Sequence, residues 1–237
     1  MIKTILFDLD GTLLPLDEAL FIQKYFGLLG KKFVSLGLNS QTMLAAVWDG
    51  TKAMIENDGK VTNEECFWTT FESRTGLKRT DIEHEFLQFY EQDFDQVSEV
   101  SKKMDIAKEI VEALHAKGIK LILATNPIFP KIATLKRIKW AGLNPKLFSF
   151  ITTYENSFFA KPNICYYEQI ITQFQLQPEE CLMVGNDVSE DMVVTKLGMP
   201  TFLLTDCLNN REGIDINLFH NGDFLQLYDY LVKQSII

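Results

Sequence analysis

Two aspartates that directly follow an apolar run near the N-terminus constrain this chain more than any other feature. The run Thr4 to Phe7 is rich in branched and aromatic residues and predicts a buried strand. Asp8 and Asp10 come next, and Gly11 allows the chain to turn sharply as it leaves the strand. Two like charges beside an apolar run are difficult to keep ionised without a cation. At the carboxyl end of a parallel strand they lie where open α/β sheets bind ligands, whereas after an edge strand they are solvated turn residues.

The composition excludes several classes of protein. With 237 residues and 46% hydrophobic content, the chain can form one large domain or two small ones with a real core. The net charge of −9 argues against non-specific binding to nucleic acid or to an anionic membrane. Most of this charge lies between Pro15 and Val100, where 15 Asp and Glu face 8 Lys and Arg. We interpret the excess as a solvated helical surface.

The cysteines and the hydropathy indicate a protein of the reducing cytoplasm. None of the four cysteines forms a CxxC pair, so neither a disulfide framework nor a zinc site is indicated. Asp8 and Asp10 interrupt the apolar N-terminus, so we expect no signal peptide, and no stretch reaches the ~18 apolar residues of a membrane span. The cysteines are Cys66, Cys165, Cys181 and Cys207.

The segment from Asp17 to about Tyr90 is predicted to be helical, because apolar residues recur three and four positions apart along it. Breaks at Asn57–Gly59 and Thr75–Gly76 divide it into roughly four helices, a small bundle. The segment is dense in aromatic residues. We expect most of them in its core and one or two facing the active site, and the sequence does not say which. Two spacings predict capping boxes, Thr62 with Glu65 and Thr80 with Glu83.

After a polar linker predicted at residues 96–103, strands and helices alternate, which is typical of a parallel sheet with helices on both faces. The sheet is therefore discontinuous in sequence, because residues 1–14 supply its first strand and residues 101–237 supply the rest. The expected helices are 104–117, 132–140, 164–174, 190–197 and 223–233, and the expected strands are 119–124, 150–152, 181–184 and 201–204.

Four short motifs occur in a fixed order, each beside an apolar run. They are DLDGT at Asp8, LILAT ending at Thr125, FFAKP around Lys161, and GNDVSED with Asp187 and Asp191. Together they resemble the signatures of the haloacid dehalogenase superfamily of phosphatases and phosphotransferases, from Ile2 to about Met199. The resemblance implies an α/β fold with a Rossmann-like parallel sheet. It also implies a catalytic core of residues 1–14 plus 101–237 and an inserted helical cap domain of residues 15–100. In this family an insertion at this point of the chain is called a type-one cap, and it closes over the pocket.

The resemblance also implies roles for the acidic residues. Asp8 is expected to be the nucleophile that forms an aspartyl phosphate, and Asp10 the general acid and then the general base. The implied cofactor is Mg²⁺, which takes oxygen ligands, held by the Asp8 and Asp187 carboxylates and the Asp10 backbone carbonyl. Asp191 lies about one helical turn beyond Asp187 and is interpreted as a direct or indirect metal partner. The alternative interpretation is that Asp191 is a negative charge stabilised by the dipole at a helix N-terminus.

Three residues are expected to bind the phosphate of a small-molecule ester. Thr125 offers a hydroxyl donor, Asn126 an amide donor, and Lys161 a positive charge for the nucleophile and the phosphoryl oxygens. Pro162 restricts the backbone beside Lys161.

We therefore expect a Mg²⁺-dependent phosphatase that hydrolyses a small-molecule phosphate monoester. A phosphomutase or another phosphotransferase would share every core residue. A phosphonatase would need a cap lysine, and nothing singles one out. Asp10 and Asp187 argue against a dehalogenase, which needs no Mg²⁺. From a different class, a phosphoacceptor signalling module is smaller and typically has adjacent acids on its first strand. The substrate and the oligomeric state stay open.

Overall fold

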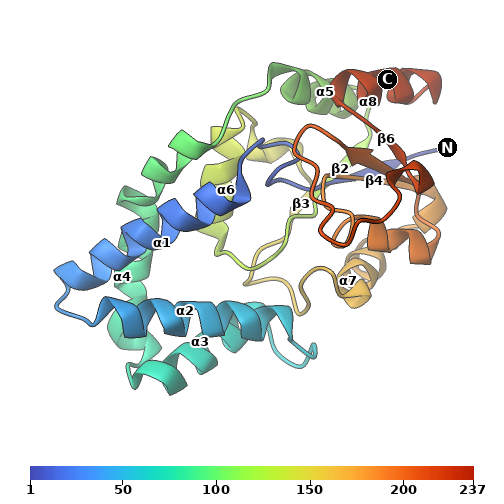
Figure 1. Cartoon of the computed structure of the whole chain (residues 1–237). Coiled ribbons are helices and arrows are strands. Elements are labelled where there is room, and N and C mark those ends of the chain that lie inside the picture. The colour runs from blue at the N-terminus through green and yellow to red at the C-terminus, as the bar shows by residue number, and fades with distance from the viewer.

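The computed structural model describes all residues from 1 to 237 and contains a six-stranded parallel sheet of order β3-β2-β1-β4-β5-β6 (Figure 1). The first strand, β1 (Thr4–Phe7), lies inside this sheet between β2 (Lys120–Leu123) and β4 (Cys181–Gly185). The aspartates thus follow a central strand, and the alternative of solvated residues after an edge strand is wrong. The remaining strands are β3 (Phe150–Ile151), β5 (Thr201–Leu204) and β6 (His220–Gly222).

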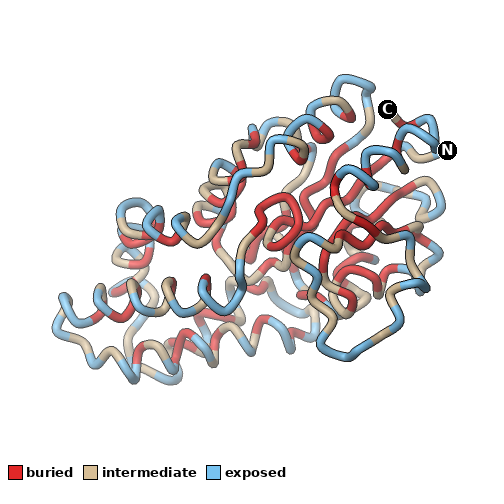
Figure 2. Tube along the Cα trace, turned by 45° about the horizontal axis from the view of Figure 1, so that its top comes forward, coloured by how far each residue is buried: buried red, intermediate tan, exposed pale blue.

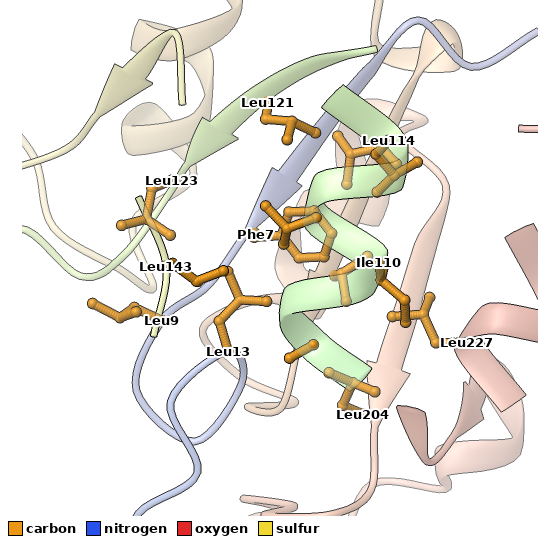
Figure 3. Packing of buried hydrophobic residues seen from close by; sticks show 14 of the residues in the cluster. Phe7, Leu9, Leu13, Ile110, Leu114, Leu121, Leu123, Leu143, Leu204 and Leu227 are labelled. Atoms are coloured by element: carbon orange, nitrogen blue, oxygen red, sulfur yellow. The ribbon is translucent and has the colours of Figure 1, made fainter. Parts of the chain in front are cut away.

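Helices cover both faces of the sheet, as the alternating pattern predicts. On one face, Phe7 packs with Ile110 of α5 (Asp105–Ala116) and Leu227 of α8 (Phe224–Lys233) (Figure 3). Side chains alternate along a strand, so Leu6 points to the other face and joins the cluster under α7 (Ile164–Phe174). The central strand is therefore buried on both faces, which explains its continuous apolar run.

The predicted bundle of four helices is confirmed. The helices lie together beside the sheet, and the two chain termini lie at the far side of the molecule (Figure 1). Buried and exposed residues alternate along them, so each helix buries one face (Figure 2). The bundle has a largely aromatic hydrophobic cluster, which also includes Ala133 and Tyr154 from outside the bundle. None of the helices combines the length and the hydropathy that a membrane span requires. The helices are α1 (Glu18–Ser35), α2 (Ser40–Ile55), α3 (Asn63–Thr75) and α4 (Arg79–Gln92), followed by the 3-10 helix η1 (Phe94–Val100).

The two connections between the sheet and the bundle lie side by side. Leu16 forms an antiparallel bridge with Ser101, and the Lys102 amide donates to the Pro15 carbonyl at 2.9 Å. This proximity agrees with the boundaries predicted at residues 14/15 and 100/101, and the division into two domains stays a prediction.

A second attachment lies at the start of α3. The Asn63 side chain is fully buried and donates to the carbonyls of Pro127 at 3.1 Å and Phe159 at 3.2 Å. The backbone amides of Asn63 and Glu64 donate to the carbonyls of Ser157 and Tyr154. The bundle is thus hydrogen-bonded to the loops that follow β2 and β3.

Some local predictions hold and others need correction. The capping box of Thr62 and Glu65 opens α3 as predicted. The capping box of Thr80 and Glu83 is wrong, because the N-cap of α4 is Lys78, two residues before Thr80, and it makes no side-chain cap. Glu83 pairs instead with Arg79, at 2.6 Å, one turn along the helix.

Three further segments differ from expectation. The polar linker predicted at residues 96–103 is partly the helix η1, because Phe94 and Val97 are fully buried. The helix predicted at residues 190–197 is a 3-10 helix, η4 (Met192–Leu197). The strand β6 was not predicted, since its three residues carry no apolar alternation. The other 3-10 segments are η2 (Pro145–Leu147), η3 (Pro178–Glu180) and η5 (Ile216–Leu218), and α6 spans Lys131–Trp140.

Candidate active site

A buried lysine joins two of the candidate carboxylates at the carboxyl end of β1. The Lys161 ammonium lies 2.9 Å from Oδ1 of Asp8 and 2.6 Å from Oδ1 of Asp191, and its side chain is completely buried. Burial alone would lower the pKa of Lys161, but the Asp191 and Asp8 carboxylates raise it well above its usual value. The site therefore holds a permanent positive charge against Asp8.

Asp191 has both of its oxygens engaged by protein donors. One accepts from Lys161, and the other accepts from the backbone N–H of Asp187 at 3.0 Å. Gly185 makes this approach possible, because a Cβ at that position would lie 2.1 Å from Oδ2 of Asp191. These bonds make Asp191 the residue that holds Lys161, and its role as a direct or indirect metal partner stays a prediction.

Asp10 is held by an arginine that the sequence analysis did not single out. Arg137, on α6, is 1% exposed, and its Nη1 donates to Oδ2 of Asp10. Its guanidinium carbon lies 4.4 Å from the Phe129 ring centroid, and Nη2 donates to Thr134 at 3.3 Å. Burial raises the pKa of Asp10 to about 6, and the Arg137 charge opposes this rise. Periodicity could not reveal Arg137, since a basic residue on a helix is normally solvated.

A buried amide connects the loops that carry the candidate metal ligands. Asn186 accepts from the Thr12 hydroxyl at 2.8 Å and donates to the Cys207 carbonyl at 2.8 Å. Gly11 has φ +81°, and a Cβ there would lie 2.4 Å from the Asn186 amide nitrogen. The glycine of the first motif thus lets Asn186 close over the loop between Asp10 and Thr12.

The predicted phosphate-binding residues lie beside the same cavity. The Thr125 carbonyl accepts from the hydroxyls of Thr152 at 2.7 Å and Tyr166 at 3.0 Å, which orients the end of β2. Asn126 accepts from the Lys161 backbone N–H at 3.3 Å and donates to both carboxylate oxygens of Glu190, at 3.0 and 3.1 Å. Its amide is therefore used within the protein, and a contact with phosphate stays a prediction. Glu190 is a further residue of the site, within the fourth motif, for which the sequence predicted no role.

The donor set fits a hard divalent cation. Asp187 accepts at Oδ1 from the amides of Ser189 and Glu190, both at 2.8 Å, and at Oδ2 from Asn209 at 2.6 Å, so its carboxylate is firmly oriented. No group of three or more His, Cys, Asp or Glu side chains could hold a metal on its own. Mg²⁺ suits such a site, because it usually keeps several waters and binds through one or two carboxylates. The carboxylates of Asp8, Asp10, Asp187, Glu190 and Asp191 outnumber the cations of Lys161 and Arg137.

A cavity of about 1160 Å³ extends from these residues to the helical bundle. Asp8, Asp10, Thr125, Asn126, Asp187 and Asp191 all line it. Lys161 lies behind its wall and reaches the site through Asp8 and Asp191. The tertiary structure therefore brings every residue named from the four motifs to one place.

Sequence comparisons relate this arrangement to known proteins. The family model described as haloacid dehalogenase-like hydrolase matches residues 2–193. The glyceraldehyde 3-phosphate phosphatase of Methanothermobacter thermautotrophicus is 29% identical over 126 residues, which are 50% of this chain and 54% of that protein. The chain thus spans about half the length of the curated relative it matches.

Solved structures share the fold over almost the whole chain. A HAD phosphatase from Thermococcus onnurineus has a TM-score of 0.59 at 20% identity and covers 97% of this chain and 98% of its own. A predicted phosphoglycolate phosphatase from Haemophilus somnus 129pt has a TM-score of 0.56 at 20% identity, covering 97% of each chain. A 2-haloacid dehalogenase from Pseudomonas syringae pv. Tomato DC3000 has a TM-score of 0.65 at 16% identity, covering 99% and 100%. At these identities the likeness concerns the fold, and it confirms the expected α/β architecture.

Proposed function

Because this chain belongs to the haloacid dehalogenase-like hydrolase family, we propose that it is a Mg²⁺-dependent phosphatase that hydrolyses a small-molecule phosphate monoester. The observation that carries this proposal is the buried ion pair of Lys161 with Asp8, 2.9 Å long, at the carboxyl end of the central strand. A phosphate dianion repels a carboxylate nucleophile, so a fixed positive charge beside both is what the attack requires.

In the first step, an oxygen of Asp8 attacks phosphorus, and the bond from phosphorus to the ester oxygen breaks. The leaving alkoxide takes a proton from the Asp10 carboxyl, whose pKa of about 6 keeps a useful protonated fraction near neutral pH. Lys161 stays charged throughout and stabilises the phosphoryl oxygens, while Asp191 keeps Lys161 in position.

In the second step, Asp10 takes a proton from a water molecule that attacks the aspartyl phosphate. Phosphate leaves, and Asp8 is restored as a carboxylate. Mg²⁺, when held by the Asp8 and Asp187 carboxylates and the Asp10 carbonyl, supplies charge that neutralises the phosphate and the excess of carboxylates. Thr125 and Asn126 complete the proposed phosphate-binding set.

The bundle of residues 15–100 is proposed to act as a cap domain over the core of residues 1–14 and 101–237. Its helices form one wall of the cavity that contains Asp8 and Asp10. A lid tied to the loop after the catalytic strand can exclude water from the reacting phosphate. Our proposal for this phosphatase also includes its localisation in the cytoplasm.

The fold does not choose among reactions, since phosphatases and a dehalogenase share it. Asp10 and Asp187 favour phosphate chemistry, because a carboxylate pair beside the nucleophile suits a cation. The names of the relatives, a glyceraldehyde 3-phosphate phosphatase and a predicted phosphoglycolate phosphatase, support the same class.

The test is phosphate release from p-nitrophenyl phosphate, with Mg²⁺ and with a chelator, beside halide release from 2-chloropropionate. We expect turnover of the ester only with Mg²⁺, and an aspartyl phosphate at Asp8 by mass spectrometry after rapid quenching. Metal-independent halide release would assign a dehalogenase instead. A stable phosphoprotein without turnover would assign a phosphoacceptor module.

A further inference from the structure

The cavity is far larger than a phosphate and a short carbon chain require. Its volume of about 1160 Å³ exceeds the range of ~300–1,000 Å³ that is common for small-molecule pockets. An ester of a two- or three-carbon acid would fill only the part beside Asp8 and Asp10. The remaining walls come mainly from the helical bundle, so their chemistry indicates what the alcohol part of the substrate is.

Half-exposed apolar side chains form the bundle wall. Trp48 is 55% exposed and Leu20 49%, and both line the cavity. The rings of Trp48 and Phe26 lie 5.8 Å apart at an interplanar angle of 57°, which makes an aromatic corner between α2 and α1. Ile55, 41% exposed, extends the same face of α2, seven residues beyond Trp48. Aromatic side chains that stay exposed inside a pocket gain free energy when a ligand covers them.

The bundle wall offers no cation for a second anionic group, and its one unpaired carboxylate, Asp17, caps the N-terminus of α1. Two cations line the cavity. Arg211 is already paired with Glu18, and Lys102 is exposed on the linker, where an ion pair contributes little. The glutamates of the wall are neutralised in the same way. These pairs are Glu18 with Arg211, Glu83 with Arg79, and Glu99 with Lys24.

We propose that the preferred substrate is the phosphate monoester of an uncharged, largely apolar alcohol of the size of an aromatic ring system. This inference rests on the phosphatase function proposed above. The phosphate lies at the core wall, and the aromatic corner of Trp48 and Phe26 covers the alcohol. A carboxylate on the alcohol would lose water beside apolar side chains without gaining a cation, which opposes its binding.

A matched set of alkyl esters tests the proposal with wild-type protein and Mg²⁺. The set is 2-phenylethyl phosphate, 2-(4-carboxyphenyl)ethyl phosphate, glycerol 3-phosphate and phosphocholine, whose leaving groups are all alkoxides. We expect kcat/KM to be highest for the phenylethyl ester, by about 10-fold or more over each of the others. Equal values, or a preference for the carboxylate, glycerol or choline ester, would overturn the inference.

Two single substitutions locate the preference on the wall. Trp48→Ala should lower the ratio of kcat/KM for 2-phenylethyl phosphate over glycerol 3-phosphate by about 10-fold, mainly through KM. Tyr228→Ala removes an aromatic side chain of α8 that is 45% exposed and does not line the cavity, and it should keep the wild-type ratio. An unchanged ratio in Trp48→Ala would overturn the inference.

The two proposals fail in different ways. Absence of Mg²⁺-dependent phosphate release from every ester would contradict the phosphatase function itself. Release from all esters with a different ranking would leave that function intact and contradict only the substrate class. Because Trp48 is half-exposed, its replacement is not expected to threaten the fold.

Discussion

The two walls of the cavity differ in how their side chains are held. On the core wall, charged groups are held in place by ion pairs or hydrogen bonds, as Lys161 is between Asp8 and Asp191. On the bundle wall, apolar side chains such as Trp48 and Leu20 stay about half exposed. A buried charge left without its partner is costly, whereas an exposed apolar group can be changed with little effect on folding. The difference separates a wall that performs chemistry from a wall that selects the substrate.

Removal of the nucleophile should produce the largest effect, equal for every ester. Asp8→Asn keeps the size of the side chain and an acceptor for Lys161 but removes the nucleophile, so turnover should fall by a factor on the order of 10⁵. Circular dichroism checks the fold, and Asp49→Asn on α2 serves as a matched control with wild-type rate. Activity of Asp8→Asn near that of the wild type would disprove the assignment.

Loss of the buried cation should affect both rate and stability. Lys161→Met leaves the carboxylates of Asp8 and Asp191 facing each other, so kcat should fall by about 10²–10³-fold. The free energy of unfolding in chelator should fall by about 3–5 kcal/mol, the range for breaking a buried ion pair. Urea titration measures the second quantity.

A second substitution in that background distinguishes the causes. Adding Asp191→Asn to Lys161→Met should recover part of the stability and none of the rate, because it relieves repulsion without restoring the charge at Asp8. Recovery of the rate would mean that Lys161 acts only by compensating Asp191.

The contact of Arg137 with Asp10 predicts a smaller effect that depends on the leaving group. An alkyl ester expels a basic alkoxide and needs the proton of Asp10, whereas nitrophenolate hardly needs it. Arg137→Gln removes the donor that orients Asp10, and this loss should outweigh the larger protonated fraction that follows from losing a nearby positive charge. It should therefore slow alkyl esters by about 10–10²-fold, less than the ~10²–10⁴-fold of Asp10→Asn, and slow the first step with nitrophenyl phosphate much less. Arg137→Lys, which keeps the charge, should recover part of the loss.

A double-mutant cycle shows whether Arg137 acts through Asp10. In the Asp10→Asn background, Arg137→Gln should have almost no further effect on alkyl esters. An equal loss in both backgrounds would place the function of Arg137 elsewhere, for instance in its packing against Phe129.

The smallest expected effect concerns Glu190 and pH. Burial raises the pKa of Glu190 from about 4.5 to about 8. In metal-free protein the folded chain then binds more protons than the unfolded chain between these values, so stability falls as pH rises through this window. Glu190→Gln removes the titration. Its Tm should match the wild type near pH 4 and exceed it by at least about 3 °C at pH 8, since each 1 kcal/mol shifts Tm by about 2–4 °C for a chain of this length.

The control for this prediction is Glu179→Gln, at an exposed position before β4. It should leave the difference in Tm near zero at every pH. A gain in Glu190→Gln that is the same at pH 4 and pH 8 would show that the cause is not the titration of this carboxyl.

Local features of the sequence predicted most elements of the architecture, although not β6. The apolar runs before Asp8 and Thr125 predicted strands that lie side by side in the sheet, and the 3.6-residue periodicity predicted four helices of the bundle. The four motifs also named residues that gather in one cavity. Such features are local, because a strand, a helix or a motif is specified by residues within a few positions of one another.

Only the tertiary structure decided which side chains meet. Arg137 is 127 positions from Asp10, and Asn186 is 174 positions from Thr12, so no periodicity connects either pair. The sequence by itself determined the fold class and the groups carried by the four motifs, but not Arg137. The packing of distant segments decided which charges are paired and that Trp48 stays exposed in the cavity, because burial is a property of the folded surface and not of any stretch of chain.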